Sequence, residues 1–480
     1  MKPSRIESCV ELPLKADVLE ETVAKAKDYT LMHGVSMHSK LAFNRDQVGT
    51  APFILLPSSF PKGEFEKSRR IQTTLNSLTH KVAHDHEFLT EKLKSTVEVD
   101  DFTARLFDIY KTVHAEGHAQ RISLGLLRSD YMLHGETDMK IVQIELNTIA
   151  SSFGGLASEV SKYHRYIFNE LGHSDKVENI PDNPAATGLA NGLVDAWSIY
   201  GKNAGVILFV VEDITYNICD QRSLEFEIRR LNSNTRVIRR TLKNLVQEET
   251  HLGPDRELIV GDHLVSVVYY RTGYQSEAYT GQADWSMRLL IERSRAIKCP
   301  SIQYHLAGTK KIQQALAQPG VLNRFLNKQE AKEIQGVFTG LYSLEFDEHG
   351  QEAVAKGIAD PTKYVLKPQR EGGGNNIYDE KVRTALESMQ DSKERTAWIL
   401  MDRINPPIHQ NYLIRSGAVG ESILQDLVSE LGIYGVVIGD ECEICVNRQV
   451  GHVLRTKPAS ANEGGIVAGD GALDSPYLIA

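Results

Sequence analysis

The stretch YVLKPQREGGGNNIY, residues 364–378, joins an apolar strand pattern to three consecutive glycines. Because glycine lacks a Cβ, the backbone N–H groups of such a loop can approach phosphate oxygens closely. Lys367 could contact phosphate, and Glu371 could bind a metal ion. The spacing of a Walker A loop is absent, as are G-x-G-x-x-G and the kinase H-R-D set. Taken alone, the stretch is also typical of a flexible hairpin turn.

A second segment with candidate ligands is KIVQIELNTI, residues 140–149, which reads as a half-buried strand. Glu145 and Asn147 are two residues apart and therefore project from the same face. Carboxylate and amide oxygens suit Mg²⁺, which usually takes one or two protein ligands beside phosphates and water. Glu371 could share this ion despite its distance in sequence. A polar strand edge at the surface is the alternative interpretation.

A third segment, LRTKPASANEGGIVAGDGA, covers residues 454–472. Arg455 and Lys457 share one face of its strand portion, and the glycine- and alanine-rich remainder could close over a small ligand. Arginine offers the bidentate geometry that a carboxylate prefers, whereas lysine suits phosphate as a point charge. A solvated charged strand followed by a floppy tail is the alternative.

Three more cations could reach a shared pocket, namely Arg128 in LRSDYM, Arg271 in YYRTGY and Lys310 in AGTKK. Thr309 has the side chain of an N-cap, which would place Lys310 in a first helical turn, where the backbone dipole favours phosphate. Taken singly, each of the three is more typical of a surface residue.

The chain as a whole has globular composition, with 480 residues of which 41% are hydrophobic and 24% charged. Its net charge of −9 includes no basic block, which argues against nucleic acid as a partner. No run of about 18 apolar residues occurs and the start lacks an apolar signal core, so we expect a cytoplasmic protein without a membrane partner. Five cysteines fit a reducing compartment. Cys442 and Cys445 are three apart on an expected hairpin, which points their thiols apart.

The order of patterns predicts a mixed α/β (α+β) protein. Helical spacing dominates 65–93 and 101–127, and alternating strands and helices follow between about 203 and 305. After these come a helix at TKKIQQALA, a polar helical stretch to about 345, and the strands KYVLK and AWILMDRI. A hairpin is expected around Gly439-Asp440.

Several separated motifs resemble the eukaryotic glutathione synthetase family in the same order along the chain. They are LGLLRSDYM, QIELNTIASSFGGLAS, NICDQR, YYRTGY, KCPSIQYHLAGTKK, YVLKPQREGGGNNIY, LMDRI, SELGIYG and GHVLRTK. The resemblance runs from about residue 120 to the end and is weaker before that point.

The resemblance implies a circularly permuted ATP-grasp fold with an inserted α/β domain and a lid, assembled as a homodimer. We expect residues 1–202 to form the helical part and the first portion of the body, 203–305 the substrate-binding domain, and 306–480 the ATP-binding portion. Within the last portion, the lid would lie at about 340–420 and a closing loop at 458–472. The implied activity is ATP-dependent ligation of γ-glutamylcysteine and glycine through an acyl phosphate. Alternatives are a ligase that uses β-alanine and a catalytically silent nucleotide-binding homologue.

The resemblance also assigns roles by position. ATP contacts fall to Glu145, Lys310, Lys367, Pro368, Gln369, Arg370, Glu371, Gly372, Gly373, Gly374, Asn375, Asn376, Tyr378, Met401, Asp402, Arg403, Ile404, Glu430, Lys457 and Glu463. Contacts with γ-glutamylcysteine and the acceptor fall to Arg128, Ile149, Ala150, Ser151, Ser152, Thr215, Tyr216, Asn217, Gln221, Arg271, Thr272, Gly273, Tyr274, Arg455, Ile466 and Val467. Glu145, Asn147 and Glu371 would hold two Mg²⁺ per active site. Arg455, Lys367 and Arg128 would be the catalytic residues.

Three positions depart from the family pattern. Glu463 replaces an aspartate, which gives a longer reach to the same ATP contact. Ala150 replaces a serine, so that substrate contact would use the backbone. Val467 replaces a smaller alanine beside the acceptor site, and relatives that prefer β-alanine differ in this loop. None of the three removes a charge that the chemistry needs.

Overall fold

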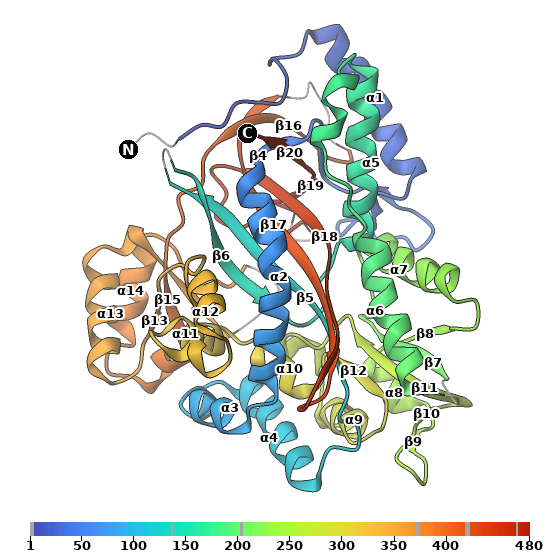
Figure 1. Cartoon of the computed structure of the whole chain (residues 1–480), viewed down its shortest axis with the longest axis vertical. Helices are drawn as coiled ribbons and strands as arrows, with labels where there is room; N and C mark the ends of the chain where they lie inside the picture. Colours follow the sequence, from blue (N-terminus) through green and yellow to red (C-terminus); the bar gives the residue numbers. More distant parts are fainter. Residues whose placement is uncertain (1–3, 136–137, 202–204, 370–373, 418–422, 467–468) are drawn as a thin grey trace.

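The computed structural model describes residues 4–135, 138–201, 205–369, 374–417, 423–466 and 469–480. A seven-stranded mixed sheet in the order β16-β3-β19-β18-β17-β5-β6 runs through the middle of the molecule (Figure 1). Its strands are β3 (Phe53–Ile54), β5 (Ser123–His134), β6 (Lys140–Asn147), β16 (His409–Ile414), β17 (Leu424–Gly439), β18 (Ile444–Pro458) and β19 (Ala472–Asp474). Segments from the beginning and the end of the chain therefore lie side by side in one sheet.

Strands β17 and β18 are the longest and form the expected hairpin, whose turn follows Gly439. Successive residues of a strand point to opposite sides, and both faces of the hairpin are covered. Val437 packs in the same core as helix α2 (Lys62–Ala83), and Val436 packs in the core that includes helix α6 (Ala185–Tyr200). Burial on both sides explains the continuous apolar run in this part of the sequence.

A second sheet has the order β8-β7-β11-β10-β9, with β12 beside β11. Its strands are β7 (Val206–Val210), β8 (Val237–Arg240), β9 (Thr250–Leu252), β10 (Leu258–Val260), β11 (His263–Tyr270) and β12 (Ile297–Cys299), and its helices are α7 (Ile218–Leu231), α8 (Leu242–Gln247) and α9 (Gln282–Glu292). Strand β7 pairs in parallel with both β8 and β11, which confirms the α/β pattern expected between 203 and 305. The domain boundaries themselves stay a prediction.

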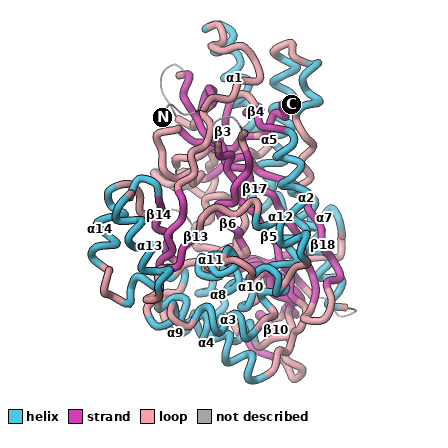
Figure 2. Tube along the Cα trace, turned by 60° about the vertical axis from the view of Figure 1, so that its left-hand side comes forward, coloured by secondary structure: helices cyan, strands magenta, loops and turns pink. Residues whose placement is uncertain are grey.

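A small antiparallel sheet in the order β13-β15-β14 lies beside β6, with two helices on its outer side (Figure 2). Its elements are β13 (Leu341–Ser343), α13 (Glu348–Ala359), β14 (Tyr364–Pro368), α14 (Glu380–Ser388) and β15 (Trp398–Asp402). Leu344, Leu366, Leu386 and Leu400 belong to a core of its own. This core is distinct from the two clusters that hold the larger sheets together.

The other elements cover the ends and faces of these sheets. The helices are α1 (Ala16–Met32), α3 (His86–Leu93), α4 (Asp101–Glu116), α5 (Gly154–Glu170), α10 (Ile302–Ala307), α11 (Lys310–Ala317) and α12 (Lys328–Gln335), and the short strands are β1 (Ser36–Met37), β2 (Gly49–Thr50), β4 (Ser58–Pro61) and β20 (Pro476–Ile479). Within the described ranges, no helix combines the length and apolarity needed to span a bilayer.

The helix expected over 101–127 is wrong in its second half. It ends at Glu116, because Gly117 adopts a φ of 82° that stops the helix, and residues 123–127 belong to β5. The helix expected over 65–93 is divided at Asp85, whose side chain accepts a hydrogen bond from Phe88 N at 2.9 Å and so begins α3. The polar stretch before residue 345 holds α12 and then the strand β13.

Asp474 at the end of β19 is a buried carboxyl group beside the hairpin. It accepts hydrogen bonds from Ser58 Oγ and Thr456 Oγ1, both at 2.6 Å. Thr456 stands between Arg455 and Lys457 on β18, so these bonds fix the strand that carries both cations. Burial raises the pKa of Asp474 from its ordinary 3.8 to about 7.

This raised pKa predicts a pH dependence of stability. Because the folded state holds the proton more tightly, the stabilisation is fully present below pH 3.8 and is lost as the pH rises through about 7. The loss amounts to at most about 4 kcal/mol. Asparagine does not titrate, so Asp474→Asn removes this pH dependence. The Tm of the variant minus the Tm of wild type should therefore increase from pH 4.5 to pH 8 in calorimetry. Parallel pH profiles for the two proteins would contradict this account.

Candidate active site

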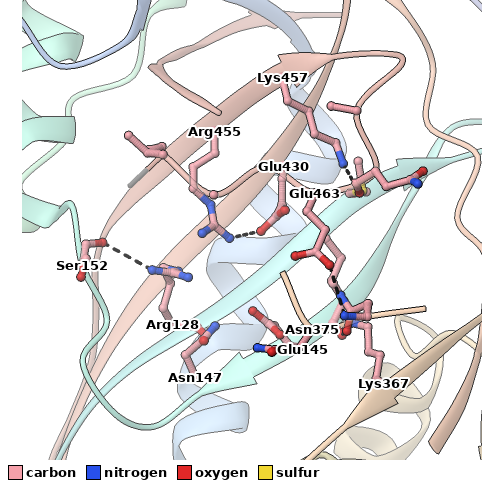
Figure 3. A pocket seen from close by; sticks show the side chains of 18 of the residues that line it. Arg128, Glu145, Asn147, Ser152, Lys367, Asn375, Glu430, Arg455, Lys457 and Glu463 are labelled. Atoms are coloured by element: carbon pink, nitrogen blue, oxygen red, sulfur yellow. Dashed lines mark hydrogen bonds and ion pairs between the residues drawn. The ribbon is translucent and has the colours of Figure 1, made fainter. Parts of the chain in front are cut away.

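A cavity of about 920 Å³ opens between the central sheet and the small sheet (Figure 3). Strands β5, β6, β17 and β18 contribute one wall, and β14 and β15 contribute the other. The loops at 149–153 and 459–466 and residues from the 212–221 segment complete the lining. Charged residues that are hundreds of positions apart in the sequence therefore meet in one place.

Glu145 meets two lysines in this cavity. Lys310 Nζ donates to Glu145 Oε2 at 2.8 Å, and Lys367 Nζ donates to the carbonyl oxygen of Ile144 at 3.3 Å. Burial on its own would raise the pKa of Glu145, but the two ammonium groups outweigh it and hold that pKa below its ordinary value. The site therefore keeps an anionic carboxylate beside cations that suit phosphate.

Lys310 is the first residue of helix α11, as expected, but Thr309 does not cap that helix. The Thr309 hydroxyl donates to the carbonyl oxygen of Leu306 at 2.9 Å instead. The preceding helix, α10, ends at Ala307, and the carbonyl oxygen of Leu306 in its last turn is the acceptor that competes for the hydroxyl.

Glu145 and Asn147 both line the cavity from β6, as their spacing predicts. Asn147 Nδ2 donates to Asp130 Oδ2 at 2.9 Å and to the carbonyl oxygen of Arg128 at 3.3 Å. These bonds use the amide nitrogen, so its oxygen is the atom that could bind a metal. A carboxylate and an amide oxygen on one strand face fit Mg²⁺. The expected third ligand, Glu371, lies outside the described residues.

Arg455 links two carboxylates at the centre of the cavity. Its Nη2 donates to Asp130 Oδ2 at 2.9 Å and also forms an ion pair with Glu430. Its Nε is buried without a hydrogen-bond partner. Burial raises the pKa of Glu430 even though Arg455 opposes this effect.

The closing loop contacts the end of the glycine loop. Glu463 accepts hydrogen bonds from the backbone N–H of Gly374 and, at 3.3 Å, of Asn376. Lys457 Nζ donates to the carbonyl oxygen of Asn462 at 2.6 Å. Figure 3 shows Lys457 and Glu463 on the same side of the cavity as Lys367. The longer side chain of Glu463 thus reaches backbone donors of the segment between β14 and α14.

Arg271 defines another region of the cavity. Its guanidinium donates to Ser152 Oγ at 2.6 Å, to the carbonyl oxygen of Ser151 at 3.2 Å and to Tyr269 OH at 3.0 Å. Its Nε is buried and unpartnered. Arg128 Nη1 donates to the carbonyl oxygen of Ser152 at 3.4 Å, so two guanidiniums flank one short loop. This region is suited to a carboxylate ligand.

Asp220 shapes that loop from behind. Its carboxylate accepts hydrogen bonds from the backbone N–H groups of Phe153 at 2.7 Å, Gly155 at 3.0 Å and Leu156 at 3.4 Å. Ala150 and Phe153 adopt positive φ angles of 51° and 76°, a conformation that L residues rarely adopt. The carboxylate compensates for this strain by satisfying three amides at the start of α5.

Most of the expected site residues line the cavity. These are Arg128, Glu145, Asn147, Ile149, Ala150, Ser151, Ser152, Tyr216, Asn217, Gln221, Arg271, Tyr274, Lys310, Lys367, Asn375, Asn376, Tyr378, Met401, Asp402, Arg403, Ile404, Glu430, Arg455, Lys457, Glu463 and Ile466. The described residues Thr215, Thr272, Gly273, Pro368, Gln369 and Gly374 are not in its lining. Arg370, Glu371, Gly372, Gly373 and Val467 lie outside the described residues.

Three charged residues at the site did not stand out in the sequence. Lys40 and Glu212 line the cavity, and Asp130 lies behind it. Lys40 comes from an exposed loop with no strand or helix pattern, so no periodicity marks it. Asp130 could have been found, because it is two residues from Arg128 and so shares its strand face.

The long hairpin, the small antiparallel sheet and the cavity with lysines around an anionic carboxylate define an ATP-grasp ligase. The fold agrees with this class: the solved structure of a glutathione synthetase-like effector from Globodera pallida superimposes with a TM-score of 0.78 at 23% identity, covering 97% of this chain and 98% of that chain. The family model for the eukaryotic glutathione synthase ATP-binding domain matches residues 16–478. The chain belongs to the eukaryotic glutathione synthase family.

Curated relatives support this membership over nearly the whole length. The chain is 44% identical to the glutathione synthetase of Xenopus laevis over 467 residues, which cover 96% of this chain and 97% of that one. Identity is 43% to the human glutathione synthetase, with the same coverage. It is 40% to the chloroplastic glutathione synthetase of Arabidopsis thaliana, with 97% of this chain and 86% of that one covered.

Proposed function

We propose that this chain joins γ-glutamylcysteine to glycine and converts ATP to ADP and phosphate in the process. The observation that carries the proposal is the single cavity that brings Lys310, Lys367 and Lys457 together with Arg128 and Arg455. The lysines suit a triphosphate, and the arginines suit a carboxylate that is to be activated.

In the first step, a carboxylate oxygen of the dipeptide attacks the γ-phosphorus of ATP, and ADP leaves. Lys310 and Lys367 offset the charge that gathers on the transferred phosphoryl group. In the second step, the glycine amine attacks the carbonyl carbon of the acyl phosphate and loses a proton, and phosphate leaves. Arg455, which lines the cavity, stabilises the oxyanion of the tetrahedral intermediate with its guanidinium. No protein nucleophile is needed, because the residues act by positioning and charge.

Magnesium fits the residues that the cavity presents. We propose that Glu145, Asn147 and Glu371 hold two ions, with ATP phosphates completing their coordination. When bound, magnesium neutralises phosphate oxygens and orients the triphosphate. Glu145 is suited to this role because Lys310 and Lys367 keep it anionic in a buried place.

Closure of the small sheet and the loop at 458–472 would keep water from the acyl phosphate. The contacts of Glu463 with Gly374 and Asn376 support this role, since they join the loop to the connection between β14 and α14. Residues that line the opposite part, such as Arg271 and Tyr274, would bind the dipeptide.

We also propose a homodimer in the cytoplasm. Several large apolar side chains within residues 31–48 are exposed and would be covered by a second copy, namely Leu31, Met32, Leu41, Phe43 and Val48. All five cysteines are free thiols, which fits a reducing compartment. Light scattering at micromolar concentration should give twice the mass of the chain, and a monomer would contradict the dimer.

The proposed reaction is tested by mass spectrometry after incubation with ATP, Mg²⁺, γ-glutamylcysteine and an equal mixture of glycine and β-alanine. We expect glutathione as the main product, with one ADP for each tripeptide. A predominance of the β-alanine product would show a homoglutathione synthetase. Absence of any amino-acid-dependent release of phosphate would show a catalytically silent homologue.

A further inference from the structure

Asp130 is a buried carboxylate directly behind the cavity, with 0% of its surface exposed. It lies on β5 opposite Glu145 of β6 on one side and opposite Gly432 of β17 on the other. A Cβ at Gly432 would come within 2.8 Å of both Asp130 Oδ1 and Arg128 Cδ. The absence of a side chain at 432 is therefore what makes room for the carboxylate and its partner.

Side chains from three strands donate to this carboxylate. Arg128 Nε donates to Oδ1 at 2.6 Å and Arg128 Nη2 to Oδ2 at 2.7 Å. Arg455 Nη2 and Asn147 Nδ2 each donate to Oδ2 at 2.9 Å. Three of these bonds go to Oδ2 and one goes to Oδ1. Asp130 is fully buried and does not line the cavity, so it acts through the residues that it holds.

Its effect on Asn147 is to select which end of the amide faces the cavity. A carboxylate accepts hydrogen bonds and cannot donate, so only the NH₂ group can point at Asp130. The amide oxygen is then left for a metal that would bind in the cavity, which Asn147 lines. Partners behind a metal ligand commonly fix its orientation, and their loss typically lowers metal affinity 10- to 100-fold.

Its effect on Arg128 and Arg455 is to hold two guanidiniums side by side. Like charges repel, and one buried anion between them offsets this repulsion. We infer that Asp130 is the positioning residue that places Asn147, Arg128 and Arg455 together, and so couples the metal ligand to the arginines of the dipeptide site. The inference rests on the proposed function.

Asp130→Asn tests this inference, because its amide keeps the shape but loses the charge and turns one acceptor into a donor. With Mn²⁺ as the probe for the metal, its dissociation constant in the presence of ATP should rise at least tenfold in electron paramagnetic resonance titrations. The KM for γ-glutamylcysteine should rise in parallel. Wild-type Mn²⁺ affinity in the folded variant would overturn the inference, whereas failure of wild type to form product would overturn the proposed function instead.

Glu292→Gln is the matched control for loss of a buried carboxylate beside arginine. Glu292 pairs with Arg288 at 3.0 Å, both side chains are buried, and neither lines the cavity. This variant should lose stability but keep the Mn²⁺ affinity and KM of wild type, and an equal loss of Mn²⁺ affinity would overturn the inference. If Asp130→Asn does not fold, Gly432→Ala displaces the carboxylate without removing it and should also weaken Mn²⁺ binding. Unchanged binding in Gly432→Ala would then be the contradicting result.

Discussion

Glu145→Gln is expected to lower kcat by roughly 10²- to 10³-fold while the chain still folds. The side chain keeps its size but can no longer be an anion. The pKa of Glu145 lies below its ordinary value because Lys310 and Lys367 outweigh the effect of burial, so the wild-type group is charged at every physiological pH. The change therefore removes an anionic metal ligand and leaves two lysines without their compensating charge.

The measurement is the initial rate of ADP release at limiting and saturating Mg²⁺, with product confirmed by mass spectrometry. Limiting Mg²⁺ should deepen the defect, because a weakened site is then less occupied. Glu64→Gln is the control. Glu64 lies on α2 and accepts a hydrogen bond at 2.8 Å from the backbone N–H of Ile141, which is on the same strand as Glu145, and Glu64 does not line the cavity. Wild-type turnover of Glu145→Gln at limiting Mg²⁺ would show that the carboxylate is not a ligand.

The sequence was sufficient for those parts of the site that depend on local periodicity. Glu145 with Asn147, and Arg455 with Lys457, line the cavity as pairs because strand residues two apart share a face. The hairpin around Gly439 was predictable from the alternating pattern of its two strands. Residue types and spacing also indicated phosphate and metal chemistry, but the identity of the substrates came from the ordered motifs.

Other parts depend on contacts between distant segments, which local patterns do not encode. Spacing alone marks Asp130 as a neighbour of Arg128. Its bond to Arg455 depends on the register across β17, which lies between β5 and β18, and no spacing within LRSDYM predicts that register. The end of α4 was misplaced because apolar residues of β5 continue the helical spacing past Gly117. Thr309 failed as an N-cap because a neighbouring helix offered its hydroxyl another partner.

Arg455→Met should lower kcat/KM for γ-glutamylcysteine by at least 10²-fold, with a smaller change in the KM for ATP. Methionine keeps much of the side-chain volume and removes the guanidinium that would bind the reacting carboxylate. The same change takes away the ion-pair partner of Glu430, whose pKa burial already raises. Breaking a buried pair on one side typically destabilises a protein by about 3–5 kcal/mol, so a fall in Tm should accompany the loss of activity.

A second substitution separates these two effects. In the double variant with Arg455→Met and Glu430→Gln, position 430 carries a neutral amide, so no buried charge there lacks a partner. The Tm should therefore recover towards wild type. Activity should not recover, because the donor to the dipeptide is still missing. If activity returns together with Tm, Arg455 serves the fold and not the reaction. If only the KM for ATP changes in the single variant, Arg455 belongs to the nucleotide site, and the carboxylate must be bound through Arg128 and Arg271 alone.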